Sequence, residues 1–60
     1  MVKLLVVREG EEDEIAECAF TDDGETLFES YKKQARYHVK LVYYGLFSEP
    51  QITKEFIPTD

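Results

Sequence analysis

The sequence predicts an α+β domain in which four strands form one antiparallel sheet and a single helix packs on one face, in the order β-β-α-β-β. Short β-branched runs lie in both halves of the chain, and one segment between them has helical periodicity. The chain has 60 residues, which is enough for one domain spanning 1–60 and no more. Hydrophobic residues make up 43% of it, so a core can form.

The first half of the chain predicts a hairpin. Residues 2–8 read VKLLVVR, which is β-branched and too short for an isolated helix. Residues 9–14 then predict an acidic loop around Gly10, and residues 15–20 predict a second strand. The alternating residues of this second strand that we expect on one face are Ala16, Cys18 and Phe20.

Residues 22–36 predict the helix. Asp22 is placed as its N-cap, and Glu25 lies three positions later, which is the spacing of a capping box. Acidic residues near its start and basic residues near its end complement the helix dipole. Its expected apolar face consists of Leu27, Phe28, Tyr31 and Ala35.

A second interpretation of this segment stays open from sequence alone. Asp23 and Gly24 form a pair that is common in tight hairpin turns, which would make residues 26–31 a strand. The domain would then be a small five-stranded β-barrel. The agreement of apolar face, caps and dipole favours the helix.

Two strands complete the predicted sheet. Residues 39–47 give the strongest strand signal, with Val39, Leu41 and Tyr43 on one side, residues 52–57 predict the last strand, and residues 48–51 form a turn that contains Pro50. With one helix on one face, the other face of the sheet is predicted to be open. Its expected apolar residues are Leu5, Val7, Ile15, Val42, Tyr44 and Ile57, mixed with Lys3, Glu17, Lys40 and Glu55. This face suggests a seam for a homodimeric structural or assembly protein.

Charge is divided along the chain. Of 13 acidic residues, ten lie between Glu9 and Glu29, and no Lys or Arg lies among them; the net charge is −6. A negative surface steers association with basic surfaces, so the favoured function is a small acidic module that binds a protein partner through a basic surface. The residues predicted to form this acidic patch are Glu9, Glu11, Glu12, Asp13, Glu14, Asp22 and Asp23.

In size, acidity and β-rich pattern the chain resembles small phage-encoded inhibitors and antitoxins as a type, although no motif assigns it to a family. The resemblance implies that the basic surface of the partner is one that binds nucleic acid. The protein would then act by blocking that surface.

An alternative function is binding of single-stranded nucleic acid, which combines a basic track with stacking aromatic side chains. Residues 32–40 place cations among aromatics, but the negative net charge makes nucleic acid a less expected partner. The residues of this alternative site are Lys32, Lys33, Arg36, Tyr37, Lys40 and Tyr44.

The sequence favours binding over catalysis. Cys18 is the single cysteine and lies in an acidic context, and His38 is the single histidine, without a nucleophile or acid placed beside it. No spacing typical of a metal or cofactor site is present, so neither is expected. The lack of a signal peptide, of a disulfide framework and of a long apolar run predicts a cytoplasmic protein without a membrane segment.

Overall fold

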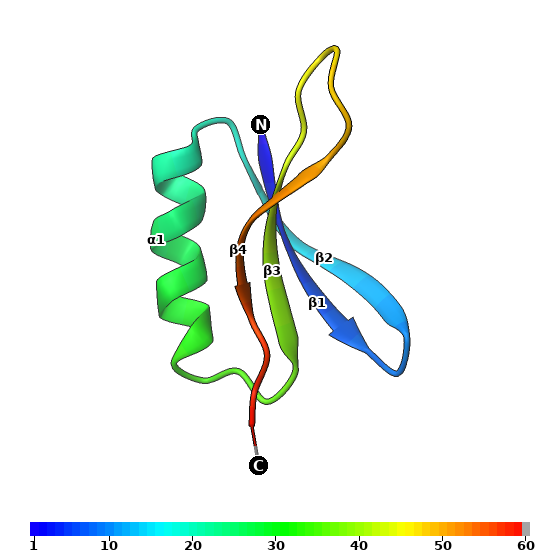
Figure 1. The fold of residues 1–60 in the computed structure, drawn as a ribbon. Coiled ribbons are helices and arrows are strands. Elements are labelled where there is room, and N and C mark those ends of the chain that lie inside the picture. Colours follow the sequence, from blue (N-terminus) through cyan, green and yellow to red (C-terminus); the bar gives the residue numbers. More distant parts are fainter. Residues whose placement is uncertain (60) are drawn as a thin grey trace.

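The structure, a computed structural model, describes residues 1–59 and confirms the predicted order of strands and helix (Figure 1). The elements are β1 (Val2–Arg8), β2 (Glu11–Cys18), α1 (Thr21–Lys32), β3 (His38–Tyr43) and β4 (Gln51–Phe56). The sheet has the order β2-β1-β3-β4, every neighbouring pair is antiparallel, and α1 crosses one face. The five-stranded barrel is excluded because residues 21–32 are helical.

The core lies between α1 and the two central strands. It is built from alternate residues of β1 and β3 and from one helix residue: Val2, Leu4, Val6, Phe28, Val39 and Leu41. Ala16 and Cys18 of β2 pack against it, as the alternation predicts. Because β1 and β3 are hydrogen-bonded on both sides, the edges of the sheet are β2 and β4.

The prediction that residues 9–14 form an acidic loop is wrong. Only Glu9 and Gly10 form the turn, and β2 begins at Glu11. Glu9 has φ 52° and Gly10 has φ 83°, and two successive positive φ values are typical of the two-residue hairpin turn that matches the twist of its strands. The acidic run therefore lies in a paired strand, and its side chains alternate between the two faces of the sheet.

The predicted start of the helix is also wrong by one residue. α1 begins at Thr21 and its N-cap is Phe20, whose side chain makes no cap hydrogen bond. Asp22 therefore lies in the first turn together with Asp23, where a carboxylate interacts favourably with the helix dipole without capping. The capping box between Asp22 and Glu25 does not form.

The helix ends at Lys32, four residues before the predicted end. Gln34 N–H donates to Tyr31 O over 3.0 Å and Ala35 N–H donates to Lys32 O over 3.3 Å, which are the shorter-range bonds of a tightened last turn. The chain then returns to the sheet, where Ala35 packs against the core. Arg36 consequently lies outside the helix.

The helix contacts the sheet through a narrower face than its apolar periodicity predicts. Phe28 is 3% exposed and Gly24 is buried, whereas Leu27 and Tyr31 are 41% and 40% exposed. A Cβ added at Gly24 would overlap the Cγ2 methyl of Val2 and lie 3.1 Å from Leu41 Cδ1. Gly24 is therefore a position at which the helix approaches the sheet closely, a contact that an apolar pattern cannot show.

Both later strands differ from their predicted ranges. β3 ends at Tyr43 instead of residue 47, and β4 spans Gln51–Phe56 instead of residues 52–57. Tyr44 N–H donates to Met1 O over 2.8 Å, which holds the chain where it leaves the sheet. Residues 44–50 form a projecting connection, which we call the arm, and Figure 1 shows it extending beyond the rest of the molecule.

Candidate protein-interaction surfaces

The face of the sheet opposite α1 is covered by the protein's own charged side chains. Leu5 and Val42 lie at its centre and are only 7% and 5% exposed, although no helix covers them. Lys3 and Lys40 extend across this face from β1 and β3, and their aliphatic stems shield apolar surface while the ammonium groups stay at the edge. The face predicted as an apolar seam is therefore a layer of paired charges over a small apolar floor.

The layer is a cross-strand ladder of lysine–carboxylate ion pairs together with one imidazole–carboxylate contact. Lys3 Nζ lies 3.0 Å from a Glu14 carboxylate oxygen and 3.8 Å from Glu17, and Lys40 pairs with Glu12. His38 Nε2 lies 2.7 Å from a Glu55 oxygen. Hydrogen bonding to Glu14, followed by the charges of Glu14 and Glu17, raises the pKa of the exposed Lys3 ammonium. The acidic run of residues 11–14 thus has a structural role, because its Glu14 and Glu12 balance the charges of Lys3 on β1 and Lys40 on β3.

A bulge in β2 creates this ladder. The pairing of β1 with β2 shifts between Leu4 and Leu5, so that Leu4 lies opposite Ala16 and Leu5 lies opposite Glu14. Ile15 is the extra residue of β2 and has no partner in β1. The residues before it are therefore shifted by one position, so that each points to the face opposite to the one that simple alternation would give. As a result Glu12, Glu14 and Glu17 share one face, which simple alternation from Glu17 would not give.

We expect Lys40→Glu to lower the free energy of unfolding by about 1 kcal/mol, because a carboxylate would then lie beside Glu12 and directly opposite Glu55. Adding Glu12→Lys should restore most of the loss by re-forming an opposite-charge pair. Urea titrations of the two single variants and the double variant measure the coupling energy. If the changes in free energy of unfolding in the two single variants add up to the change in the double variant, Lys40 and Glu12 do not interact.

The other face has its own charge pairs. Arg8 Nη2 donates to Asp13 Oδ2 over 2.6 Å, its guanidinium carbon lies 5.8 Å from the centre of the Tyr37 ring, and hydrogen bonding to Asp13 raises its pKa further. Lys54 on the edge strand β4 lies 3.7 Å from Glu25 and 3.5 Å from Glu29, so it ties that edge to the helix. Arg8 thus links β1 to β2, and Lys54 links β4 to α1.

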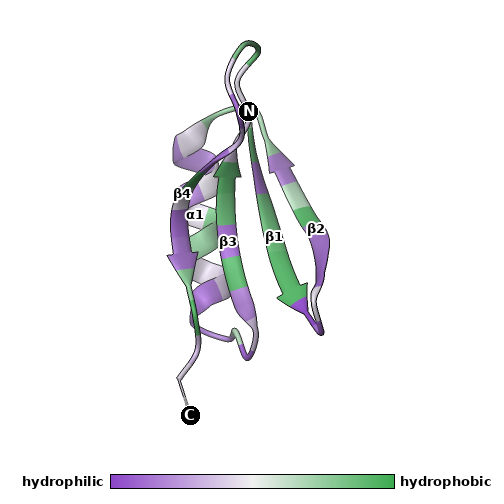
Figure 2. Ribbon diagram, turned by 45° about the vertical axis from the view of Figure 1, so that its right-hand side comes forward, coloured by the Kyte–Doolittle hydropathy of each residue, from purple (hydrophilic) through white to green (hydrophobic). Residues whose placement is uncertain are grey.

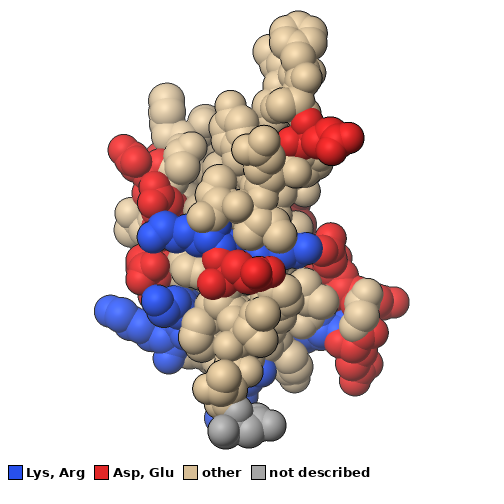
Figure 3. All heavy atoms as spheres, in the orientation of Figure 1, with Lys and Arg blue, Asp and Glu red and all other residues tan. Residues whose placement is uncertain are grey.

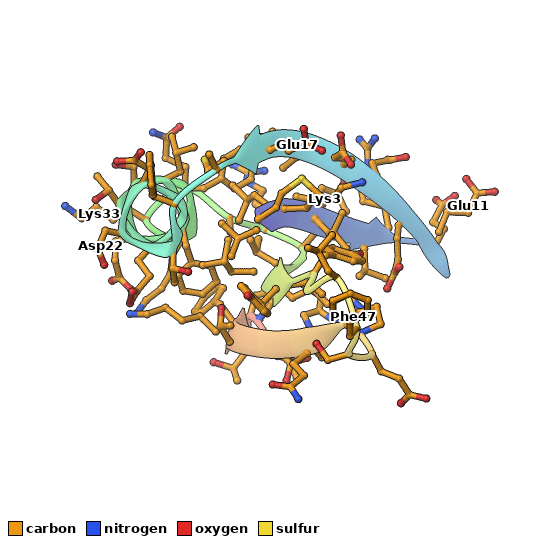
Figure 4. The ribbon with its side chains drawn as sticks, turned by 90° about the horizontal axis from the view of Figure 1, so that it is seen from above. Lys3, Glu11, Glu17, Asp22, Lys33 and Phe47 are labelled. Carbon is orange, nitrogen blue, oxygen red and sulfur yellow. The ribbon has the colours of Figure 1, made fainter. Side chains whose placement is uncertain are left out.

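This pairing leaves few charges free for a partner. Among residues 1–59, the carboxylates with no Lys or Arg nitrogen within 4.0 Å are Glu9, Glu11, Asp22, Asp23, Glu49 and Glu55, and Glu55 contacts the His38 ring. The acidic patch predicted from sequence is therefore divided. Glu9 and Glu11 lie by the β1–β2 turn, Asp22 and Asp23 lie at the start of α1, and Figure 4 shows Glu11 and Asp22 on opposite sides of the molecule.

The basic and aromatic stretch is divided as well. Lys40 and Tyr44 lie with the charge ladder, where Lys40 pairs with Glu12 and Lys3 Nζ lies 5.2 Å from the centre of the Tyr44 ring. The other predicted residues gather at the end of the helix; they are Lys32, Lys33, Arg36 and Tyr37. Of the lysines and arginines, only Lys33 and Arg36 lack a carboxylate within 4.0 Å in the described chain. The six residues do not form one continuous track.

The arm carries the most exposed apolar side chains in the described chain. Leu46 is 94% exposed and Phe47 is 100% exposed at its tip, and Figure 2 colours this tip as apolar. Figure 3 shows that Lys and Arg side chains lie in the middle and lower parts of that view, whereas its upper end shows only uncharged and acidic residues. Other exposed apolar residues towards this end are Met1, Phe20, Tyr43 and Ile52.

The sequence interpretation missed Leu46 and Phe47 because it extended a strand through them. A signal was present: Gly45 precedes them and the turn-forming residues 48–50 follow directly. Two bulky apolar residues enclosed by turn residues have no neighbouring strand to pack against. Such a pair indicates loop residues that contact a binding partner.

Two adjoining pockets lie on the helix side of the sheet, beyond the end of α1. The first has a volume of about 230 Å³ and is lined by Val6, Tyr31, Gln34, Ala35, Arg36, Tyr37 and Val39. The second has a volume of about 240 Å³ and is lined by Arg8, Glu9, Glu11, Asp13 and Tyr37. Tyr37, which is half exposed, is common to both. The first is mainly apolar with a cationic rim, and the second is mainly acidic.

The groups considered for chemistry have structural surroundings. Cys18 is half-buried against the core, and His38 contacts Glu55 within the charge ladder. Within residues 1–59, no three side chains of His, Cys, Asp or Glu gather in a way that could hold a metal ion. In the same part of the chain, no helix has the length and apolar character needed to cross a membrane.

Comparison of the chain with protein-family models, with curated proteins and with solved structures gives no match. The interpretation of function therefore depends on these surfaces themselves.

Proposed function

We propose that the protein is a protein-binding module that contacts its partner through the arm. The observation that carries this proposal is the exposure of Leu46 and Phe47, which are 94% and 100% exposed at the tip of a projecting connection. Large apolar side chains presented in this way have no role in the core. They supply the kind of anchor that fills a pocket in a partner and dominates the binding energy.

The partner we propose carries an apolar pocket bordered by Lys and Arg. Glu49 lies in the arm itself and has no cation within 4.0 Å among the described residues. Asp22 and Asp23 lie towards the same end of the molecule, on the helix side. Unpaired carboxylates around an apolar anchor steer association with a basic surface and raise the rate of encounter.

A basic surface is common among proteins that bind nucleic acid. If the partner is of that class, occupation of its surface would make this protein an inhibitor or an antitoxin. The support for this finer proposal is the net charge of −6 together with the position of the unpaired carboxylates. We do not include Glu12 and Glu14 among the proposed main contacts, because they pair with Lys40 and Lys3 within the molecule.

Affinity capture from a lysate of the source cells tests the proposal. We expect the double variant Leu46→Ser and Phe47→Ser to retain its partner at least about tenfold less well, because truncation of anchor side chains costs that much or more in binding. Ile57→Ser is the matched control, since Ile57 is also an exposed apolar residue, at 62%, and lies outside the arm. Captured proteins are identified by mass spectrometry after nuclease treatment, which removes contacts bridged by nucleic acid.

A second pair of variants tests the charges. Asp22→Asn with Asp23→Asn should weaken capture and reduce its sensitivity to salt, because these two carboxylates pair with no internal cation, and circular dichroism checks that α1 still forms without their interaction with the helix dipole. Reversal of Glu12 and Glu14 is a poor test, since it would also break the charge ladder of the sheet. Equal capture by the wild type, the arm variant and the Ile57→Ser control would contradict the proposed function.

A further inference from the structure

We propose that a second copy of this chain is one partner of the arm, so that the protein forms a reciprocal dimer. In this dimer, Phe47 of each copy enters the apolar pocket beyond the end of α1 in the other copy, Leu46 packs at the mouth of that pocket, and Glu49 faces Arg36. The inference rests on the proposed function of the arm as a binding element. It deepens that function by naming an occupant whose pocket is present in the same molecule.

The pocket has the chemistry that the arm requires. Its floor consists of Val6, Ala35 and Val39, and Tyr31 and Tyr37 form its aromatic walls. A volume of about 230 Å³ accommodates one large aromatic side chain. The pocket exists because α1 ends at Lys32 and the chain then turns back to the sheet, which leaves the lower part of that sheet face without a covering helix.

The free charges of the two surfaces are complementary. Arg36 lines the pocket, and Lys33 lies directly before that lining in the chain. These two are the basic side chains without an internal carboxylate partner among residues 1–59. The arm carries Glu49, which has no internal cation partner in the same part of the chain. Docking therefore brings an unpaired carboxylate to an unpaired guanidinium at the edge of an apolar contact, which fixes orientation.

The positions of arm and pocket allow both contacts to form at once. The molecule is elongated, with extents of 37 × 23 × 15 Å, and Figure 1 places the arm at one end of the long axis and the end of α1 at the other. Two copies lying antiparallel bring each arm to the other's pocket. Such an arrangement has a two-fold axis and closes on itself, so it gives a dimer rather than a filament.

Sedimentation equilibrium on the full chain tests the dimer. We expect a species of twice the 7.0 kDa monomer mass within a range of about 5–500 μM, which spans the affinities of small interfaces. Glu49→Arg and Arg36→Glu should each remain monomeric in that range, because each places like charges at both contacts. Circular dichroism checks the fold of each variant. Glu49 is exposed and Arg36 lies on the rim of the pocket, so neither change disturbs the core.

An equimolar mixture of these two variants is the decisive measurement. In a mixed dimer, the arginine introduced into the arm of one copy meets the glutamate introduced at the pocket of the other. At the second contact the unchanged Glu49 meets the unchanged Arg36, so both contacts become favourable. We expect the mixture to dimerise at least about tenfold more tightly than either variant alone. The chain with both changes should dimerise as well. Failure of the mixture and of this double variant to associate would overturn the inference.

Three further outcomes would overturn the inference, and the first of them leaves the proposed function of the arm intact. A wild-type protein that stays at 7.0 kDa throughout the range, yet loses captured partners in the arm variant, would overturn the dimer and retain the arm as a contact. Mass that increases with concentration beyond two copies would overturn the closed reciprocal arrangement. A dimer that persists unchanged in Phe47→Ser would show that another surface makes the contact, and it would also overturn the inference.

Discussion

Replacement of Phe28 by alanine is expected to abolish the cooperative folded state or to lower its midpoint temperature by at least about 15 °C. Phe28 is 3% exposed and is the one helix side chain in the buried core cluster, so it provides most of the apolar contact between α1 and the sheet. Truncation of a buried phenylalanine costs about 3–5 kcal/mol, because transfer energy is lost and a cavity remains.

The size of the domain makes this loss severe. Stability of about 0.05–0.15 kcal/mol per residue gives a chain of this length only a few kcal/mol in total. Leu27→Ala is the matched control, since Leu27 is the adjacent helix residue and is 41% exposed. Thermal unfolding followed by far-ultraviolet circular dichroism measures both variants. Similar midpoints for Phe28→Ala and Leu27→Ala would show that the helix does not pack through Phe28.

The second large effect is expected at Gly24. In a helix, a change from glycine to alanine ordinarily stabilises by about 1 kcal/mol. Here the added Cβ would overlap the Val2 methyl and crowd Leu41, and both of these side chains are fully buried. Overpacking costs about 1–3 kcal/mol and the gain in helix propensity offsets about 1 kcal/mol of it, so we expect Gly24→Ala to lower the midpoint temperature by about 4–8 °C.

Ser30→Ala provides the control for helix propensity. Ser30 lies in the same helix and is exposed, so the substitution should leave the midpoint unchanged or raise it slightly. The two alanine variants should therefore shift the midpoint in opposite directions or by clearly different amounts. A higher midpoint in Gly24→Ala would mean that the helix stands further from the sheet than this structure shows.

Residues 11–14 show where sequence reasoning fails. Their acidic composition predicts a solvated loop, since four successive carboxylates have no apolar alternation. They form a strand because the two-residue turn at Glu9 and Gly10 fixes the hairpin and because Lys40, Lys3 and Arg8 lie close enough to pair with Glu12, Glu14 and Asp13. Lys40 comes from β3, which is distant in the chain, so its part of the compensation is invisible to a local window.

The arm shows a related failure. Residues 39–47 are rich in β-branched and aromatic residues, which predicts one long strand, and Leu46 and Phe47 continue the apolar run. Strand length is decided by the partner, and pairing of β3 with β1 runs from His38 to Tyr43, opposite Val7 to Val2. The last backbone hydrogen bond beyond this ladder joins Tyr44 to Met1, and the chain leaves the sheet there.

By itself, the sequence determined the order of strands and helix and the position of Leu5 and Val42 on the face of the sheet away from the helix. Those features depend on local periodicity and on length, which each segment carries within itself. Tertiary structure alone decided which charges remain available and which apolar residues remain exposed. Ion pairing across strands, the bulge at Ile15 and the end of pairing at Tyr43 depend on residues that are distant in the chain. The candidate contact consequently moved from the acidic run to the arm.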